Sequence, residues 1–439
     1  MIDPVREAAL KTLLDIEGKG SYSNLTIGIQ LDNPVFTAID RSFLSQLVYG
    51  TLKWKLKIDW IISQFSKIRI ERISPPILNI LRIGIFQLLF LDRVPASAAC
   101  NESVSLAHNY GHRGSVAFVN AMLRGISAKK GSISYPGSED DVLKYLSINY
   151  SYPEWIVNLW LEQFGQKFVE ELLAAGNSEP PFTIRLSVPG ADKDHVISYR
   201  AEVEDILQKS GVASRPGNFI DEALIIEDPS IFMKTEFYRK GRFYIQDEAA
   251  MLVSRILAPL PREFVIDVCS APGGKTAHLA ELMGDNGTIL ARDIHDSRLK
   301  LVSGISKRLG LKSIEYEVWD AVKEDSVLCG KADKVLVDAP CSGLGILRRK
   351  PEIKWRRKPQ DCLDLAKLQG EVLDSSAKLL KKGGIMVYST CTINTVENED
   401  VIAGFLERSK EFRLTNDFIH LYPNVDGTDG FFIARMLKE

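Results

Sequence analysis

Several residue types and patterns are scarce in this chain, and each absence excludes a class of protein. The 439 residues include only six cysteines and six histidines, and no Cys-x-x-Cys pair occurs. Cysteines at such irregular spacings do not form a disulfide framework, and histidines this scattered predict that no metal is bound. The most apolar stretch, around Ile83–Leu91, is too short to cross a bilayer.

The amino-terminal residues contain no basic segment followed by an apolar run, so no secretory signal is indicated. With 45% hydrophobic and 26% charged residues, the composition is that of an ordinary globular protein. We therefore expect a cytoplasmic monomer that does not bind membranes. Thiols stay reduced in that compartment, which favours a catalytic use of cysteine.

The net charge of −2 conceals an uneven distribution along the chain. Residues 1–130 carry 16 Lys and Arg against 10 Asp and Glu, whereas the remainder is acidic overall. A basic amino-terminal region is compatible with a face that binds nucleic acid. A solvated helical surface has much the same composition, so charge alone leaves both interpretations open.

The pattern of apolar residues divides the chain into three predicted parts. Residues 1–130 show helical spacing, as in Ile77–Leu91, and predict an all-α domain. Residues 131–240 contain a polar connector followed by mixed short strands and helices, which predicts a small α+β module. Residues 241–439 alternate apolar strands with helices, which is typical of a parallel sheet covered on both faces. The predicted fold is a doubly wound, Rossmann-like α/β domain with these two additions. Its expected strands are Phe264–Val268, Thr288–Ile294, Ile314–Trp319, Lys334–Asp338 and Ile385–Thr390.

The first of these strands runs into a glycine turn and then a helix, an arrangement that lets a ligand approach the backbone. The predicted cofactor loop comprises Cys269, Ser270, Ala271, Pro272, Gly273, Gly274 and Lys275. It matches neither the dinucleotide pattern Gly-x-Gly-x-x-Gly nor the P-loop pattern. A cofactor with ribose and adenine but no phosphates fits better, and S-adenosylmethionine is the common one. Asp293 and Asp320 end the next two strands and are expected to bind the ribose and to lie beside the adenine.

Two further strands lead directly to cysteines. Asp338 ends one strand and precedes Cys341, and Cys391 follows the strand that ends at Thr390. Because the carboxyl ends of parallel strands share one edge of the sheet, both thiols are expected beside the cofactor loop. Two unrelated core cysteines at this edge are improbable, although a single one would more often be structural.

Two thiols beside a methyl donor indicate pyrimidine methylation. Carbon 5 of a pyrimidine is a weak nucleophile until a thiolate adds to carbon 6, and a second thiolate, or a water it positions, can remove the carbon 5 proton. Asp338, if protonated, can donate to N3 of the ring, and Lys275 can stabilise a thiolate. The target base must be unpaired or flipped out of its helix.

A basic segment follows Cys341 and predicts contacts with RNA phosphates and a stacked base. Its candidate RNA-binding residues are Arg348, Arg349, Lys350, Lys354, Trp355 and Arg356. The alternative is a solvated basic loop without function.

These motifs resemble those of the Nop/Sun family of RNA 5-methylcytosine methyltransferases. The segment Val265–Thr276 is similar to the family's cofactor loop, Asp338–Gly343 to its Pro-Cys motif and Ser389–Cys391 to its Thr-Cys motif. The resemblance implies that Cys391 is the nucleophile and that Cys341 assists release. Thr395–Glu399 departs from the family pattern, since it lacks a proline and a first glutamate, which puts specificity in doubt rather than activity.

Residues 4–130 resemble the helical RNA-binding domain of the antitermination protein NusB. This domain joined to this catalytic core implies a bacterial family member that methylates one cytosine of 16S ribosomal RNA. Transfer RNA as substrate, or a catalytically silent RNA-binding or assembly factor, are the alternatives. A DNA methyltransferase is disfavoured, because the chain lacks a Glu-Asn-Val motif and such enzymes have no use for a second cysteine at position 391.

Overall fold

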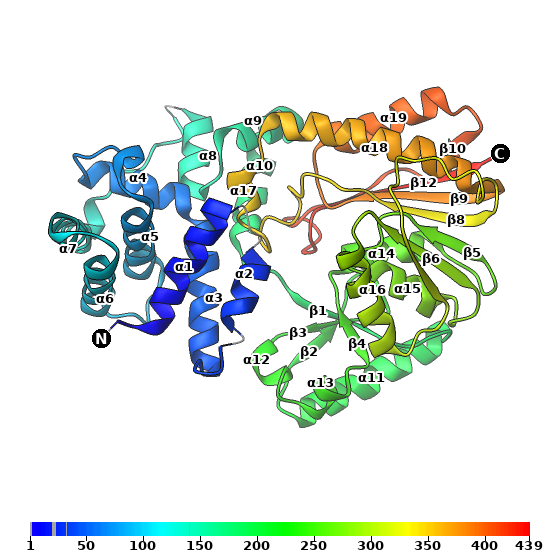
Figure 1. Cartoon of the computed structure of the whole chain (residues 1–439), viewed down its shortest axis with the longest axis horizontal. Helices are drawn as coiled ribbons and strands as arrows, with labels where there is room; N and C mark the ends of the chain where they lie inside the picture. Colours follow the sequence, from blue (N-terminus) through cyan, green and yellow to red (C-terminus); the bar gives the residue numbers. More distant parts are fainter. Residues whose placement is uncertain (1, 20–22, 32, 140) are drawn as a thin grey trace. The chain divides into compact units, whose positions relative to one another are not determined.

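The computed structural model describes residues 2–19, 23–31, 33–139 and 141–439. The chain forms two compact units (Figure 1). The helical unit comprises Met1–Ser178 together with Leu347–Arg357, and the sheet unit comprises Glu179–Ile346 together with Lys358–Glu439. The finer division predicted at residues 130 and 240 stays a prediction.

The helical unit packs around α5 (Pro75–Phe90), which is mostly apolar, is buried along most of its length and begins with prolines in its first turn. Ile80, Leu81, Ile83 and Ile85 of this helix are fully buried. The unit contains α1 (Pro4–Lys19), α2 (Ser23–Leu31), α3 (Ala38–Lys53), α4 (Lys55–Phe65), η1 (Ile70–Arg72), α5 (Pro75–Phe90), α6 (Ala96–Tyr110), α7 (Arg113–Ala128), η2 (Lys130–Ser132), α8 (Val142–Tyr150), α9 (Glu154–Phe164), α10 (Gln166–Asn177) and α17 (Ile353–Arg356). The prediction of an all-α amino-terminal domain is confirmed.

A small antiparallel sheet begins the sheet unit. Its strand order is β2-β3-β1-β4, and Ile184, Leu224 and Phe232 lie in the core between this sheet and its helices. Its elements are β1 (Phe182–Leu186), α11 (Lys193–Lys209), β2 (Ser214–Pro216), β3 (Ala223–Ile226), α12 (Pro229–Phe232), α13 (Glu236–Lys240) and β4 (Phe243–Ile245). The predicted small α+β module is confirmed.

The large sheet of this unit has eight strands in the order β10-β12-β9-β8-β5-β6-β7, with β11 paired to β12. The strands are β5 (Phe264–Asp267), β6 (Thr288–Asp293), β7 (Ile314–Val318), β8 (Ala332–Asp338), β9 (Leu380–Thr390), β10 (Phe412–Leu414), β11 (Ile419–Leu421) and β12 (Phe431–Lys438). Strands β5 to β9 pair in parallel, which confirms the doubly wound core, whereas β10, β11 and β12 add an antiparallel edge that was not predicted.

Helices cover both faces of this sheet, because its central strands are apolar on both sides. Figure 1 shows α18 and α19 on one face and α14, α15 and α16 on the other. The covering elements are α14 (Glu248–Leu257), α15 (Gly274–Leu282), α16 (Asp296–Leu309), α18 (Pro359–Leu379), η3 (Thr395–Glu397) and α19 (Glu399–Arg408). The carboxyl ends of β5, β8 and β9 therefore meet at one edge, where the predicted site residues lie.

Candidate active site

The two cysteines at this edge are in direct contact. Strands β8 and β9 are neighbours in parallel register, with Asp338 opposite Ser389, so the chain leaves both strands at the same level. The sulfur atoms of Cys341 and Cys391 lie 3.2 Å apart, and both are half-buried thiols outside any disulfide. The structure thus brings together the two cysteines that the strand order predicted to be neighbours.

The contact between the sulfurs affects the acidity of Cys341. The hydrogen bond to Cys391 raises the pKa of the Cys341 thiol well above its ordinary value, and burial adds to the effect. A Cys341 thiol that keeps its proton can donate a hydrogen bond to the Cys391 sulfur. This geometry is compatible with nucleophilic attack by Cys391, which stays a prediction.

Lys275 and Asp338 form a charged pair beside the thiols. The Lys275 Nζ donates to Asp338 Oδ2 at 2.8 Å, and the Ser389 hydroxyl donates to Asp338 Oδ1 at 2.9 Å. Burial alone would lower the pKa of Lys275, but the charge of Asp338, with a contribution from Cys391, outweighs burial and raises it. The ammonium therefore stays charged and can stabilise a thiolate. Both oxygens of Asp338 accept hydrogen bonds here. Donation from Asp338 to N3 of the base requires a protonated carboxyl group, so this role stays a prediction.

The predicted cofactor loop joins β5 to α15. Gly273 has a φ of +112°, and a Cβ at this position would lie 2.9 Å from Val302 Cα, so only glycine fits without rearrangement. Within the described part of the chain, the buried hydroxyl of Ser270 has no hydrogen-bond partner. The remaining loop residues are Cys269, Ala271, Pro272 and Gly274, and burial raises the pKa of the Cys269 thiol, which makes this third cysteine of the edge unreactive.

The two predicted cofactor acids lie on neighbouring strands. Asp293 ends β6 and is buried, and its carboxylate is 3.1 Å from the Arg298 guanidinium, which also donates to Ala271 O at 3.0 Å. Asp320 follows β7 and accepts from the Val322 amide at 3.3 Å. Both carboxylates thus lie where the strand pattern predicted them. Asp293 is on the strand next to β5, which leads into the loop, and Asp320 follows the strand after that.

Three charged residues near the loop were not predicted. Asp267 ends β5, and burial, with a smaller contribution from the Asp338 charge, raises its pKa to about 7. Arg298 bridges the loop and Asp293, as described above. Arg185 of β1 is fully buried and donates to Gly274 O and to Glu281 Oε2, each at 2.9 Å. For Arg185 the sequence did contain a signal, which was an arginine within a mostly apolar predicted strand.

The basic segment after Cys341 requires a correction. Leu347–Arg357 belongs to the helical unit, and only 1% of the Lys354 side chain is exposed. Lys354 Nζ donates to Ser151 O at 3.3 Å and to Asn177 Oδ1 at 3.1 Å. Trp355 Nε1 donates to Leu52 O at 2.7 Å, and its ring packs on the helical core. Lys354 and Trp355 therefore anchor α17 inside the helical unit. The prediction that Lys354 contacts RNA is wrong for this fold because the side chain is buried, whereas RNA contact by the half-buried Trp355 stays a prediction.

The other four candidate RNA-binding residues have mixed environments. Arg356 donates to Ile16 O at 3.2 Å, Arg348 is buried, and Arg349 and Lys350 are half-buried. RNA binding by these four residues stays a prediction.

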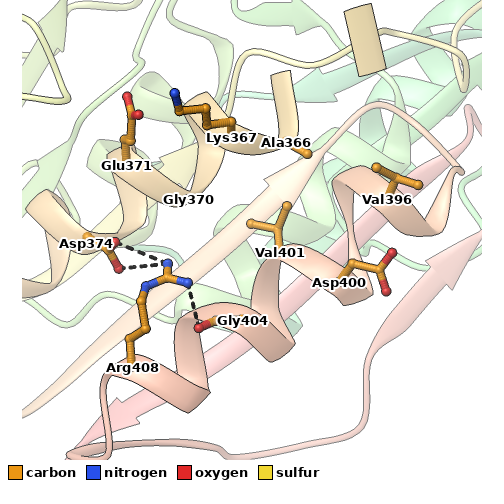
Figure 2. Close-up of a pocket in the computed structure, with 10 residues that line it drawn as sticks. All are labelled: Ala366, Lys367, Gly370, Glu371, Asp374, Val396, Asp400, Val401, Gly404 and Arg408. Carbon is orange, nitrogen blue, oxygen red and sulfur yellow. Dashed lines mark hydrogen bonds and ion pairs between the residues drawn. The ribbon is translucent and has the colours of Figure 1, made fainter. Parts of the chain in front are cut away.

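One surface groove of the sheet unit is not lined by the two thiols. It has a volume of about 420 Å³ and lies between α18 and α19 (Figure 2). In Figure 2, Arg408 of α19 pairs with Asp374 of α18 across one end of the groove. The predicted site residues do not line it, so the groove is no candidate for the catalytic centre.

No helix described by the structure is long and apolar enough to span a membrane. Over the same residues, no group of three His, Cys, Asp or Glu side chains is placed to hold a metal ion.

Comparison with known proteins gives matches along most of the chain. The family model for the 16S rRNA methyltransferase RsmB/F matches residues 254–437. The model of the NusB family matches residues 3–128, and that of the ferredoxin-like domain of RsmF/B-like methyltransferases matches residues 152–232. These three matches correspond to the predicted catalytic, helical and middle regions.

Curated relatives match over almost their full length. The probable ribosomal RNA small subunit methyltransferase B of Bacillus subtilis is 35% identical over 452 residues, covering 99% of each chain. The corresponding protein of Synechocystis is 34% identical, again with 99% coverage of both chains. Among solved structures, that of PH0851 has a TM-score of 0.82 and 27% identity and covers 100% of this chain and 99% of its own.

The structure of NSun6 from Pyrococcus horikoshii with SFG has a TM-score of 0.58 and 23% identity. It covers 66% of this chain and 99% of its own, and it agrees with the fold alone. The resemblance read from the motifs is confirmed by the full-length relatives: this chain belongs to the RsmB/F family of 16S rRNA methyltransferases and carries the NusB-type helical domain at its amino-terminal end.

Proposed function

We propose that this protein methylates carbon 5 of a cytosine in 16S rRNA through a covalent bond between Cys391 and carbon 6 of the base. The observation that carries the proposal is the contact of the two thiols, 3.2 Å apart, beside the charged Lys275. A methyltransferase that acted on a base nitrogen or a ribose hydroxyl would have no use for a paired thiol and thiolate.

The chemistry follows from the charge states of the pair. The Cys391 thiolate adds to carbon 6, and the electrons of the ring double bond move to carbon 5, which then acts as the nucleophile. Release requires loss of the carbon 5 proton, re-formation of the double bond and cleavage of the bond between sulfur and carbon 6. S-adenosylmethionine, when bound, supplies the methyl group.

Cys341 is the proposed base for the second half of the reaction. Its pKa is raised mainly by the hydrogen bond to Cys391. Once Cys391 is bonded to carbon 6, that sulfur is no longer a charged acceptor, and the main cause of the raised pKa is gone. Cys341 can then ionise and accept the carbon 5 proton, directly or through a water molecule.

The residues at the edge of the sheet fit S-adenosylmethionine. Gly273 allows the tight turn to pack against Val302 of α16, and the Ser270 hydroxyl is a buried donor without a partner in the described chain. Asp293 and Asp320 provide carboxylates for the ribose and for the adenine edge. The fold relative NSun6 was solved with SFG, an analogue of S-adenosylmethionine, which agrees with this choice.

RNA is the proposed partner, with 16S rRNA favoured over transfer RNA. The support is the NusB-type domain at residues 3–128 and the ribosomal substrate in the names of the full-length relatives.

The test is tritium release from RNA labelled at carbon 5 of cytosine, because only substitution at that carbon liberates the label. The protein and S-adenosylmethionine are incubated with labelled 16S rRNA from cells that lack the enzyme, and in parallel with labelled transfer RNA. We expect stoichiometric release from the 16S rRNA and none from the transfer RNA. Methyl transfer without tritium release would contradict carbon 5 as the target, and release from transfer RNA alone would contradict the substrate.

A further inference from the structure

A fully buried carboxylate, that of Glu397, lies between the two cysteine loops. Glu397 ends the short helix η3, which follows the Cys391 loop, and its side chain has no exposed surface. Its Oε2 accepts from the backbone amide of Ser342, the residue after Cys341, at 2.7 Å. The side chain thereby reaches from the loop of one cysteine to the loop of the other.

The other oxygen holds the carboxylate in its own loop. Glu397 Oε1 accepts from Asn394 Nδ2 at 2.7 Å, and the Asn394 Oδ1 accepts in return from the Glu397 amide at 3.2 Å. Gln369 of α18 donates to Glu397 Oε2 at 3.1 Å and to Pro340 O, directly before Cys341, at 2.9 Å. Three donors thus converge on the two oxygens, an arrangement that suits the acceptor capacity of a carboxylate.

Further bonds join the same two loops near the thiols. The hydroxyls of Ser342 and Thr392 are 2.9 Å apart, and the Gly345 amide donates to Cys391 O at 3.0 Å. A Cβ at Gly345 would lie 2.9 Å from Cys391 O, so the backbones of the two loops approach closely. Two neighbouring loops with this many cross-bonds form one rigid support for the thiols.

We propose that Glu397 is a positioning residue that holds the Cys341 thiol against Cys391. It thereby increases the rate of the release step of the reaction. This inference rests on the proposed function for its catalytic consequence, although not for its geometry. The charge of Glu397 is also among the causes that raise the pKa of Cys341, after the Cys391 hydrogen bond and burial. Glu397 touches neither the base nor the cofactor in this scheme, and it acts through Ser342 and the loop of Cys341.

Glu397→Gln is the informative variant because it keeps the volume and removes one acceptor. A glutamine has one oxygen and one NH₂ group, so in either orientation its NH₂ group faces a donor, Asn394 on one side or Ser342 and Gln369 on the other. Glu397→Asp keeps the charge but is shorter by one methylene group. Glu399→Gln is the matched control, since Glu399 lies two residues away and bonds to His420.

The first measurement needs neither RNA nor cofactor. Diamide takes two electrons and two protons from a pair of thiols, so a disulfide forms and the reagent becomes a hydrazine. The rate of closure between Cys341 and Cys391 is followed by peptide mass spectrometry, with thermal unfolding as the check that each variant is folded. We expect closure at least tenfold slower in Glu397→Gln, an intermediate rate in Glu397→Asp and the wild-type rate in Glu399→Gln.

The second measurement separates positioning from general damage. In single-turnover reactions with 16S rRNA, Glu397→Gln should slow decay of the covalent adduct more than its formation. Wild-type closure by folded Glu397→Gln would overturn the proposal, as would equal slowing of both steps. If Glu397→Gln does not fold, wild-type closure in Glu397→Asp overturns it. Slowed closure with no adduct in any variant would instead contradict the proposed function and leave the positioning role standing.

Discussion

Cys341 and Cys391 are separated by 50 positions in the chain, yet their sulfur atoms lie 3.2 Å apart. The contact arises because β8 and β9 pair in parallel with Asp338 opposite Ser389, so that both loops leave the sheet together. At this distance the protonation of one thiol affects the pKa of the other. In the proposed mechanism Cys391 is the nucleophile and Cys341 the base, and Cys341 ionises once Cys391 is bonded to the substrate.

Removing the ammonium beside the thiols should lower the reactivity of Cys391. In Lys275→Met the partner of Asp338 is lost, and its carboxylate at 2.8 Å from the former Nζ is left without a counter-charge. We expect alkylation of Cys391 by iodoacetamide at neutral pH to slow by about tenfold, which corresponds to about one unit of thiol pKa. Lys382→Met, at an exposed position of β9, is the control. Equal alkylation rates in wild type and Lys275→Met would contradict the role given to Lys275.

The glycine turn should be intolerant of a side chain. Gly273→Ala forces a residue with a Cβ into a φ of +112° and against Val302, 2.9 Å away. We expect at least a tenfold weaker binding of S-adenosylmethionine by calorimetry and a loss of about 1–3 kcal/mol in unfolding free energy. Gly304→Ala, in the interior of α16 with open space around its Cβ, should bind normally and be stabilised by about 0.5–1 kcal/mol. Normal binding by Gly273→Ala would show that the turn is not the cofactor site.

The buried Asp267 should make stability depend on pH in a direction unusual for a carboxyl. Its pKa is 3.8 in its ordinary state and about 7 in the folded protein. The folded state therefore holds the proton more tightly, and this stability is fully present below pH 4 and is lost as the pH rises through 7. Asp267→Asn lacks this dependence.

The measurement is the difference in unfolding free energy between Asp267→Asn and wild type. We expect it to shift in favour of the variant by about 2–3 kcal/mol between pH 5 and pH 7.5. Asp417→Asn, at an exposed carboxyl, should show no such change. A difference that stays constant with pH would contradict the raised pKa.

Much of the large sheet and the meeting of its residues could be predicted from the sequence. Apolar strands alternating with helices determine a parallel sheet, and a parallel sheet brings residues after each strand to one edge. That logic places Cys341, Cys391, Asp338 and the Gly273 loop together without any distance information. The same logic does not predict the contact of Arg185 with the loop. Arg185 belongs to the small sheet, and its contact with the loop depends on tertiary packing.

The misread basic segment shows the limit of composition. Lys354 and Trp355 have the residue types of an RNA-binding surface, but their partners, Ser151 and Leu52, lie about 200 and 300 positions earlier in the chain. No local pattern specifies such partners, and a lysine is rarely buried. The antiparallel edge strand β12 was missed because pairing order depends on contacts that strand composition does not encode.

The corrected role of Lys354 can be tested by salt dependence. A residue that binds an RNA phosphate contributes about one to the slope of log affinity against log salt, whereas a structural residue contributes nothing. We expect Lys354→Met to leave the slope unchanged and to lose about 1–3 kcal/mol of unfolding free energy, because two hydrogen bonds to Ser151 and Asn177 are removed. The exposed Lys67→Met is the control for stability. A slope reduced by one, with unchanged unfolding free energy, would show that Lys354 does contact RNA and would contradict the structural role.

The central claim is that Cys391 attacks the base and Cys341 releases it, and trapping of the covalent adduct tests it most directly. The protein, Cys341→Ala and Cys391→Ala are each incubated with S-adenosylmethionine and unmethylated 16S rRNA, and species that survive denaturing electrophoresis are quantified. Cys341→Ala should accumulate a denaturant-resistant protein–RNA adduct, because the carbon 5 proton is not removed, and Cys391→Ala should form neither adduct nor methylated product. An adduct formed equally well by Cys391→Ala would contradict the account.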